Sequence, residues 1–410
     1  MNNNRNFLVY GAATASFGYI FSIATGSIGM LLFIASWLLN FRDLNFKNLL
    51  KWNNLFILTL FFLIFLLGIF YSINIVQGQK DIIRHLPFLI FPLIFITIKP
   101  FLKKERLLIV KIFIHSLSIF FCICLITAII RQIGFWHRGG IFNWYYFYRY
   151  DFLEIFNQHP TYLSMFTLLS IGFLLFSKSQ LLLSKVLFYL TILIQTLALI
   201  LYGSRIGYIL LFLIILIHFF KNLLSKEETN RIRYVLIYSI GLSILFLISF
   251  NIPIVKERFL YTIGYKYDYK FNNKEFIKHN SPEELGRLLL WQDAADLIKE
   301  NPFLGYGTGA TRDVLLQKYK KEDHTLFLEK RFNAHNSYLE LLLSGGIILL
   351  ISYLAILLVL FLKSVRKKDY VLFSFALIIT ITSITESLFI AQGILFISFF
   401  YCFFLIKINE

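Results

Sequence analysis

Blocks of 15 to 25 mostly apolar residues recur along this chain of 410 residues and constrain its fold more than any other feature. A helix rises about 1.5 Å per residue, so blocks of this length cross a hydrocarbon core of about 30 Å. Charged residues make up only 15% of the chain, against roughly 25% in a soluble domain. Because a water-soluble protein could not bury so much apolar surface, the sequence predicts an all-α, polytopic membrane protein.

About twelve apolar blocks are long enough to be separate transmembrane helices. They are predicted near residues 7–24, 26–40, 54–76, 85–98, 107–131, 160–177, 184–201, 205–220, 234–251, 336–362, 370–386 and 388–406. The chain then divides into a bundle of about nine spans in 1–251, a large loop in 252–335, and a bundle of about three spans in 336–410.

Lysine and arginine are distributed unevenly over the segments that connect these spans. With the N-terminus in the cytoplasm, the cytoplasmic segments hold 19 of these residues and the short outer segments hold six. Positive residues favour the cytoplasmic side, so both termini are expected there and loop 252–335 is expected outside. The net charge of +17 is then a signal of topology and of contact with lipid headgroups, and nucleic acid is not a predicted partner.

The large outer loop is predicted to be partly helical. Within 252–335, Ser281 is a candidate N-cap, and Glu284 completes a capping box with it. Apolar residues then recur at helical spacing, which predicts a helix over 282–300. The glycine-rich stretch 305–309 follows and predicts a turn.

An enzyme that acts on the outer leaflet has access to neither nucleotide sugars nor ATP, so its activated substrate must be linked to a lipid. Stretch 305–309 lacks the Lys-Ser/Thr of a phosphate loop. No metal site and no cofactor are predicted, because Asp293 and Asp296 are better explained as the surface of the loop helix. A glycosyl transfer that expels a diphosphate then needs positive charge from arginine or lysine, and arginine suits it best because its planar guanidinium matches phosphate oxygens.

Two outer arginines are candidates for this task. Arg205 interrupts two apolar blocks at the outer face of the membrane, where a charge is costly without a use or a partner. Its alternative role is to extend towards lipid headgroups. Arg287 lies on the predicted loop helix, where an ion pair with Glu283 is the alternative explanation.

His335 is the candidate catalytic base. It lies where the large loop returns to the membrane, and Ser337 and Glu340 behind it have the spacing of a capping box. The positive end of the helix dipole favours neutral imidazole, which can remove a proton from a sugar hydroxyl. An interfacial histidine that only binds water is the alternative.

Three further residues are candidates for substrate binding, namely His159, Asn336 and Glu386. His159 opens a span from the outer side, although the proline after it also explains the position as a helix start. Asn336 directly follows His335. Glu386 lies near the outer turn of the last pair of spans, where it also fits the end of a helix.

Three segments together resemble the O-antigen ligase and polymerase family. They are Gly203-Ser-Arg205, then Arg287-Leu-Leu-Leu-Trp291 with Asn301-Pro-Phe-Leu-Gly-Tyr-Gly307, and finally His335-Asn-Ser-Tyr-Leu-Glu340 with Gly345-Gly346. The resemblance covers about residues 195–360, in a chain with many spans and a large outer loop before the last three. Ligases of this family often have glycine, threonine or tyrosine where Ile348 stands, so the ligase and polymerase alternatives both stay open.

The resemblance implies a metal-independent, inverting glycosyltransferase with the GT-C type of membrane fold. Its donor would be a polysaccharide on undecaprenyl diphosphate, and its acceptor a sugar of the lipid A-core at the periplasmic face of the bacterial inner membrane. Arg205 and Arg287 would hold the donor diphosphate, and His335 would activate the acceptor hydroxyl. A lipid-linked glycan flippase is a further alternative, but such transporters usually place charged or polar residues near the bilayer centre, and these spans are nearly free of charge at their centres.

Overall fold

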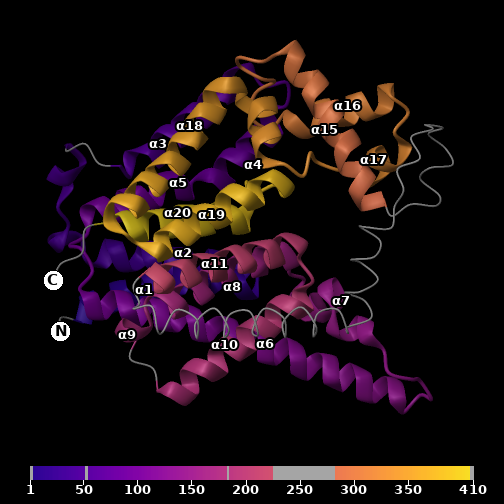
Figure 1. Ribbon diagram of the computed structural model, residues 1–410. Coiled ribbons are helices and arrows are strands. Elements are labelled where there is room, and N and C mark those ends of the chain that lie inside the picture. Colours follow the sequence, from indigo (N-terminus) through magenta and orange to yellow (C-terminus); the bar gives the residue numbers. More distant parts are fainter. Residues whose placement is uncertain (1–2, 51–53, 182–183, 225–281, 407–410) are drawn as a thin grey trace. The chain divides into compact units, whose positions relative to one another are not determined.

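The computed structural model describes residues 3–50, 54–181, 184–224 and 282–406 (Figure 1). Every regular element in these ranges is a helix, which agrees with the all-α prediction. The chain forms two compact units. The first consists of Met1–Tyr19, Ile23–Ile109 and Phe271–Glu410, and the second consists of Ile20–Ser22 and Val110–Lys270.

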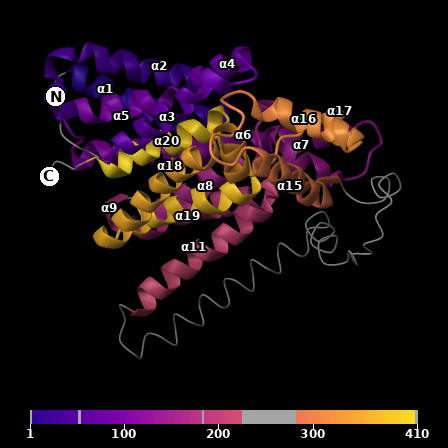
Figure 2. The ribbon, with the colours of Figure 1, turned by 90° about the horizontal axis from the view of Figure 1, so that it is seen from above.

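The first unit contains the N-terminal helices, the helices in the second half of the predicted loop 252–335, and the C-terminal helices. Its helices are α1 (Asn3–Phe21), α2 (Ile23–Leu39), α3 (Phe56–Leu67), α4 (Ile75–His85), α5 (Pro87–Thr97), α15 (Pro282–Glu300), α16 (Thr311–Lys321), α17 (Thr325–Lys330), α18 (Ser337–Lys367), α19 (Tyr370–Thr385) and α20 (Ala391–Leu405). Helix α18 packs against α3 and α19, and α20 packs against α5 (Figures 1 and 2).

The second unit contains most of α6 (Lys103–Trp136), a helix that begins in the first unit. The other helices of this unit are α7 (Arg149–Leu153), α8 (Pro160–Phe176), α9 (Lys178–Leu181), α10 (Lys185–Tyr202) and α11 (Arg205–Leu224). Helix α8 packs against both α10 and α11. Its residues from Pro160 to Leu174 are buried, which makes α8 the core of this unit.

Several helices are long and apolar enough to cross a membrane, which makes the chain a multi-pass membrane protein. By length and composition, four described helices qualify, namely α6, α10, α11 and α18, or up to five if the bent pair Arg149–Phe156 and Pro160–Phe176 is one span. The shorter apolar helices are Ile23–Leu39, Phe56–Tyr71, Tyr370–Thr385 and Ala391–Leu405. The predicted span 234–251 and the loop residues 252–281 lie outside the described residues.

Helix α18 is broken at a pair of glycines, and this break holds the loop helices against the membrane bundle. The second glycine, Gly346, has φ 61°, and a Cβ atom there would lie 2.1 Å from the backbone oxygen of Phe303. This position therefore requires glycine. The predicted turn 305–309 lies against the break, because Tyr306 N–H donates to the carbonyl of Leu343 at 2.7 Å.

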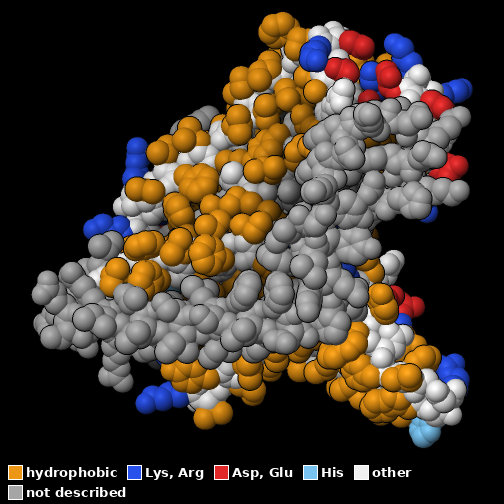
Figure 3. Space-filling model, turned by 45° about the vertical axis from the view of Figure 1, so that its right-hand side comes forward, with side chains coloured by type: hydrophobic (Ala, Val, Ile, Leu, Met, Phe, Trp, Pro, Cys, Tyr) orange, Lys and Arg blue, Asp and Glu red, His pale blue; other side chains and the backbone are white. Residues whose placement is uncertain are grey.

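Helices α15, α16 and α17 form a small layer with a core of its own. The predicted helix 282–300 is confirmed as α15, and the loop glycines occupy the turn that follows it. The core consists of Leu290, Ala294, Leu297, Val314, Leu315, Tyr319, Phe327, Ala334 and Leu343. Acidic and basic side chains gather at the top of Figure 3, at the height of these helices in Figure 1, and hydrophobic side chains cover much of the face below. This distribution suits an aqueous layer on a membrane bundle.

Candidate functional site

His335 lies in the short connection between α17 and α18, at the entrance to the last long helix. Its backbone has φ 45°, a left-handed conformation that non-glycine residues adopt at a cost. The N–H of His335 donates to Asn333 Oδ1 at 3.1 Å, which fixes this turn. The side chain is 31% exposed, so the imidazole is accessible.

The predicted capping box of Ser337 and Glu340 is wrong. The N-cap of α18 is Asn336, whose side-chain oxygen accepts from the backbone N–H groups of Tyr338 and Leu339 at 3.0 and 3.2 Å. Asn336 is the N-cap because its short amide side chain reaches two N–H groups of the first turn. These N–H groups have no acceptor within the helix. Its predicted part in substrate binding stays a prediction.

Ser337 instead joins α18 to the connection between α19 and α20. Its hydroxyl donates to the backbone oxygen of Glu386 at 2.7 Å and accepts from the N–H of Leu388 at 2.8 Å. Nearby, Ser387 Oγ donates to the Glu340 carboxylate at 2.5 Å. The start of α18 therefore fixes the position of Glu386, which is the C-cap residue of α19.

The Glu386 carboxylate lies between an arginine and the candidate base. Glu386 Oε1 is 3.3 Å from Arg287 Nη2, and Glu386 Oε2 is 3.8 Å from His335 Nδ1. Three residues that the sequence singled out separately are thus brought together in one unit. The side chain of Glu283, the predicted partner of Arg287, is not among the side chains described.

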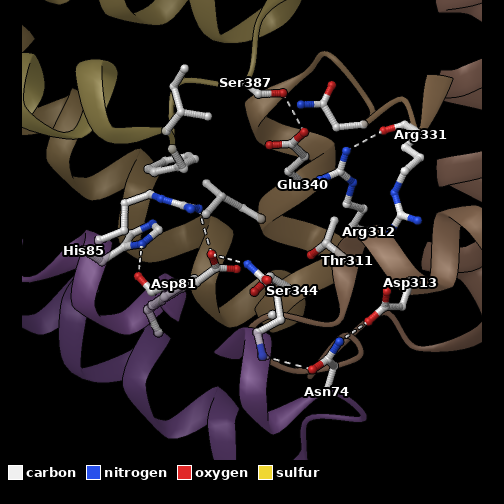
Figure 4. Close-up of a pocket in the computed structure, with 18 of the residues that line it drawn as sticks. Asn74, Asp81, His85, Thr311, Arg312, Asp313, Arg331, Glu340, Ser344 and Ser387 are labelled. Atoms are coloured by element: carbon white, nitrogen blue, oxygen red, sulfur yellow. Dashed lines mark hydrogen bonds and ion pairs between the residues drawn. The ribbon is translucent and has the colours of Figure 1, made fainter. Parts of the chain in front are cut away.

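His335 lines a cavity of about 560 Å³ in the first unit. Figure 4 shows this cavity with Asp81, Arg312 and Glu340 among the labelled residues. The wall of this cavity comes from α4, the start of α16, the α17–α18 connection, the first turns of α18 and the α19–α20 connection. Cavities of this size hold small molecules or a few units of a polymer. Polar side chains and the aromatic rings of Phe65, Phe332 and Phe389 both line it, a mixture that suits the polar rim and apolar faces of a sugar.

Helix α4 contributes a polar face that was not predicted to belong to the site. Gln77, Asp81 and Arg84 line the cavity from positions that fall on one side of a helix. Asp81 Oδ1 accepts from Gln77 Nε2 at 2.9 Å and from Arg84 Nη1 at 2.7 Å. Burial raises the pKa of the Asp81 carboxyl, and Arg84 and Gln77 oppose this shift. The i, i+4, i+7 spacing is the signal that could have identified this face.

Two other arginines, Arg312 and Arg331, were also missed as cavity residues. Arg312 lies in the first turn of α16, and Arg331 follows the last residue of α17. Arg312 Nη2 donates to the backbone oxygen of Arg331 at 3.1 Å. Neither residue belongs to a motif that the sequence offered, and only the packing of α16 and α17 places them together.

Arg205 belongs to the second unit, where it is the first residue of α11. Gly203 ends α10 with φ 63°, and a Cβ atom there would lie 2.5 Å from the ring of Tyr148. Ser204 Oγ then accepts from the N–H of Gly207 at 3.2 Å, as an N-cap does. Glycine and serine thus form the break between two helices, and Arg205 stands half-buried at the start of the second. Its predicted contact with a diphosphate stays a prediction.

His159, also in the second unit, caps helix α8. Its Nδ1 accepts from the N–H of Thr161 at 3.3 Å, and its Nε2 lies 2.9 Å from the hydroxyl of Tyr150. The helix-start explanation for this residue is therefore confirmed. Its role in substrate binding stays a prediction.

The interpretation of Asp293 as a surface residue is wrong, whereas that of Asp296 is confirmed. Asp293 is 4% exposed, and its Oδ2 lies 2.9 Å from His324 Nδ1. Burial raises the pKa of Asp293, and His324 opposes this shift. Asp296 pairs with Lys299 and Lys318 at the surface. The two carboxylates differ because Asp293 faces the core between α15 and α17.

Within the described ranges, no group of three or more His, Cys, Asp or Glu residues could hold a metal ion.

The fold and the site describe a multi-pass, all-α membrane protein with a polar cavity beside a helical layer. Comparison with known families adds that residues 190–354 match the family model described as O-antigen ligase. This match confirms the resemblance over residues 190–354, the part of the chain that the family model covers. Comparison with curated proteins gave no match.

Proposed function

We propose that the chain is an O-antigen ligase. In this proposal it transfers a polysaccharide from undecaprenyl diphosphate to a sugar hydroxyl of lipid A-core, at the periplasmic face of the bacterial inner membrane and with both termini in the cytoplasm. The match over residues 190–354 supports the family. The observation that carries the chemistry is that Glu386 contacts both Arg287 and His335 where His335 opens onto the cavity.

His335 is the general base in this mechanism. If Nδ1 carries its proton towards Glu386, then Nε2 is the unprotonated atom that faces the acceptor. Nε2 removes the proton of the acceptor hydroxyl while the oxygen forms a bond to the anomeric carbon of the donor. The 3.8 Å separation from Glu386 is longer than a hydrogen bond, and such contacts often shorten when substrate binds.

The leaving group is undecaprenyl diphosphate, which takes the electron pair of the broken anomeric C–O bond. We assign Arg205 and Arg287 to this diphosphate, because a guanidinium can place two donors on phosphate oxygens. The contact with Glu386 holds Arg287 in place and uses one of the five N–H donors of its guanidinium. Displacement from the opposite face inverts the configuration at the anomeric carbon.

The mechanism assigns no step to a metal ion. Treatment of the purified protein with a chelator such as EDTA should leave the rate of transfer unchanged. A rate that falls with EDTA and recovers with a divalent cation would overturn the metal-independent mechanism.

A repeat-unit polymerase is the second candidate, because Ile348 departs from the residues that ligases often have at this position. It would use the same base and the same arginines with a second lipid-linked glycan as acceptor. The experiment that separates the two is a gel of lipopolysaccharide and of carrier-linked glycans from cells that lack the gene. Long polymer left on the carrier beside bare lipid A-core identifies a ligase, and single repeat units on lipid A-core identify a polymerase.

The same assay, with the gene restored as Arg205→Lys, tests the diphosphate contact. Lysine keeps the charge but loses the planar pair of donors, so we expect transfer to fall at least about tenfold. Transfer at the normal level would show that Arg205 does not hold the diphosphate in this way.

A further inference from the structure

The wall of the cavity holds three carboxylates and three arginines, but only one carboxylate and one arginine form an ion pair with each other. Three carboxylates line it, and each already has a partner. Asp81 accepts from Gln77 and Arg84, Asp313 accepts from Asn74 at 2.5 Å, and Glu340 accepts from Ser387. The only ion pair among these contacts joins Asp81 to Arg84 at 2.7 Å, so one of the three arginines of the wall has a carboxylate partner.

The other two arginines, Arg312 and Arg331, form no ion pair with any residue of the described ranges. They lie next to each other, since Arg312 Nη2 donates to the backbone oxygen of Arg331 (Figure 4). Arg331 also lies four positions before His335, in the same connection to α18. Two positive side chains and the candidate base thus line the same cavity.

Solvated surface arginines are common and usually need no partner. One contact argues against that explanation here. Arg312 is tied by its guanidinium to the α17–α18 connection, which fixes one of its donors beside the cavity. Arg331 has φ 52° at the C-cap of α17, a position where glycine would be less strained. Glycine can therefore replace Arg331 without straining this cap.

We propose that Arg312 and Arg331 bind an acidic group, a carboxylate or a phosphate, on the sugar that occupies the cavity. The proposal rests on the proposed function, because that function makes the occupant a glycan. Guanidinium groups pair with either acid through parallel N–H donors. An acidic group on the glycan can pair directly with these two guanidinium groups, so the two arginines determine which sugar occupies the cavity that His335 lines.

The test is binding of three simple sugars to the full-length protein in detergent, with no lipid-linked substrate present. The probes are glucose, glucuronic acid and glucose 6-phosphate, and the measured quantity is the ratio of their Kd values. We expect one or both acidic sugars to bind about tenfold more tightly than glucose. The acid with the larger ratio identifies the substituent as carboxylate or phosphate.

Arg331→Gly separates binding from folding, because glycine suits the left-handed cap while the guanidinium is lost. Arg312→Gln removes the second charge and keeps a side-chain donor. Each variant should reduce the preference for acidic sugars to about threefold or less. The matched controls are Lys368→Gly, which removes a cation from a similar left-handed C-cap on α18, and Lys320→Gln on α16. Both controls should keep the full preference.

Equal binding of acidic and neutral sugars by the unmodified protein would overturn the proposal. So would a preference that survives in Arg312→Gln and Arg331→Gly together. The outcome is independent of catalysis, since His335→Asn should abolish transfer and leave the ratio of Kd values unchanged. If transfer is absent from the unmodified protein but the preference is present, the ligase proposal fails and the acidic-sugar site stands.

Discussion

Two walls of the same cavity differ in how the chain builds them. The wall with His335 comes from one connection between helices, and hydrogen bonds of Asn333, Asn336 and Ser337 fix its backbone. The α4 wall comes from the first quarter of the chain, outside the matched residues 190–354, and holds a network of side chains. In our proposal the first wall performs the chemistry and the α4 wall contributes to binding of the acceptor.

The same contrast applies to the partners of each wall. Glu386 stands between a guanidinium and an imidazole, so its charge acts on both. Asp81 accepts from two neighbours on its own helix. We therefore expect changes to His335 and Glu386 to affect the rate of the chemical step, and changes in the α4 wall to affect the binding of the acceptor.

The largest effect should follow from loss of the His335 imidazole. General bases contribute about 100- to 10,000-fold to such reactions, so kcat of His335→Ala should fall by that factor. Alanine is strained at φ 45°, whereas asparagine tolerates this conformation, so His335→Asn should lose the same activity and keep the fold. Transfer by the purified variants measures the loss, and size-exclusion elution checks the fold. Near-normal turnover in His335→Asn would assign the base to another residue.

A smaller loss is expected when Glu386 loses its charge but keeps its shape. Glu386→Gln removes the anion that holds Arg287 and orients His335, while the imidazole itself remains. We expect kcat to fall about tenfold to a hundredfold, part of the contribution of the base. The KM of the acceptor should change little.

The control for this variant is Glu322→Gln, which removes a carboxylate that pairs with Lys318 at the surface. Its activity should be normal. A loss in Glu386→Gln as large as that of His335→Asn would mean that Glu386 reacts directly with the substrate.

Ser337→Ala should reduce stability, because it leaves the buried N–H of Leu388 without an acceptor. An unsatisfied buried group of this kind costs about 1–3 kcal/mol. The matched control is Ser344→Ala in the same helix, since Ser344 Oγ is buried and forms no hydrogen bond within the described ranges. Thermal unfolding should show a lower Tm for the first variant only. Equal Tm values for Ser337→Ala and Ser344→Ala would mean that the hydrogen bonds of Ser337 do not stabilise the α19–α20 connection.

Much of the fold was predictable because hydrophobic length and local signals determine it. The predicted loop helix 282–300 has the same bounds as the observed helix α15. The turn at 305–309 could be predicted from its glycines. Arg287 and His335 could be named because each lies in a recognisable segment. The capping box failed because Asn336 and Ser337 both suit an N-cap, and only the contact of Ser337 with the distant Glu386 decides between them.

The α4 wall was not predicted because its partners are far away in the sequence. Asn74 bonds to Asp313, 239 positions along the chain, and no local pattern reports such a pairing. The burial of Asp293 was missed for the same reason, since it depends on His324 in another segment. Side chains at helical spacing define a face, but the element that covers this face is determined by tertiary packing.

The smallest expected effect concerns Asp81, and it tests whether the α4 wall binds the acceptor. Asp81→Asn keeps the shape of the side chain and weakens its bonds to Gln77 and Arg84, so their donors are held less firmly towards the cavity. Loss of about one hydrogen bond to a sugar should raise the KM of the acceptor about three- to tenfold, with kcat nearly unchanged. Asp43→Asn is the control, because Asp43 pairs with Lys99 at an exposed position. If kcat falls and KM does not, Asp81 belongs with the chemistry of His335, and the division between the two walls is wrong.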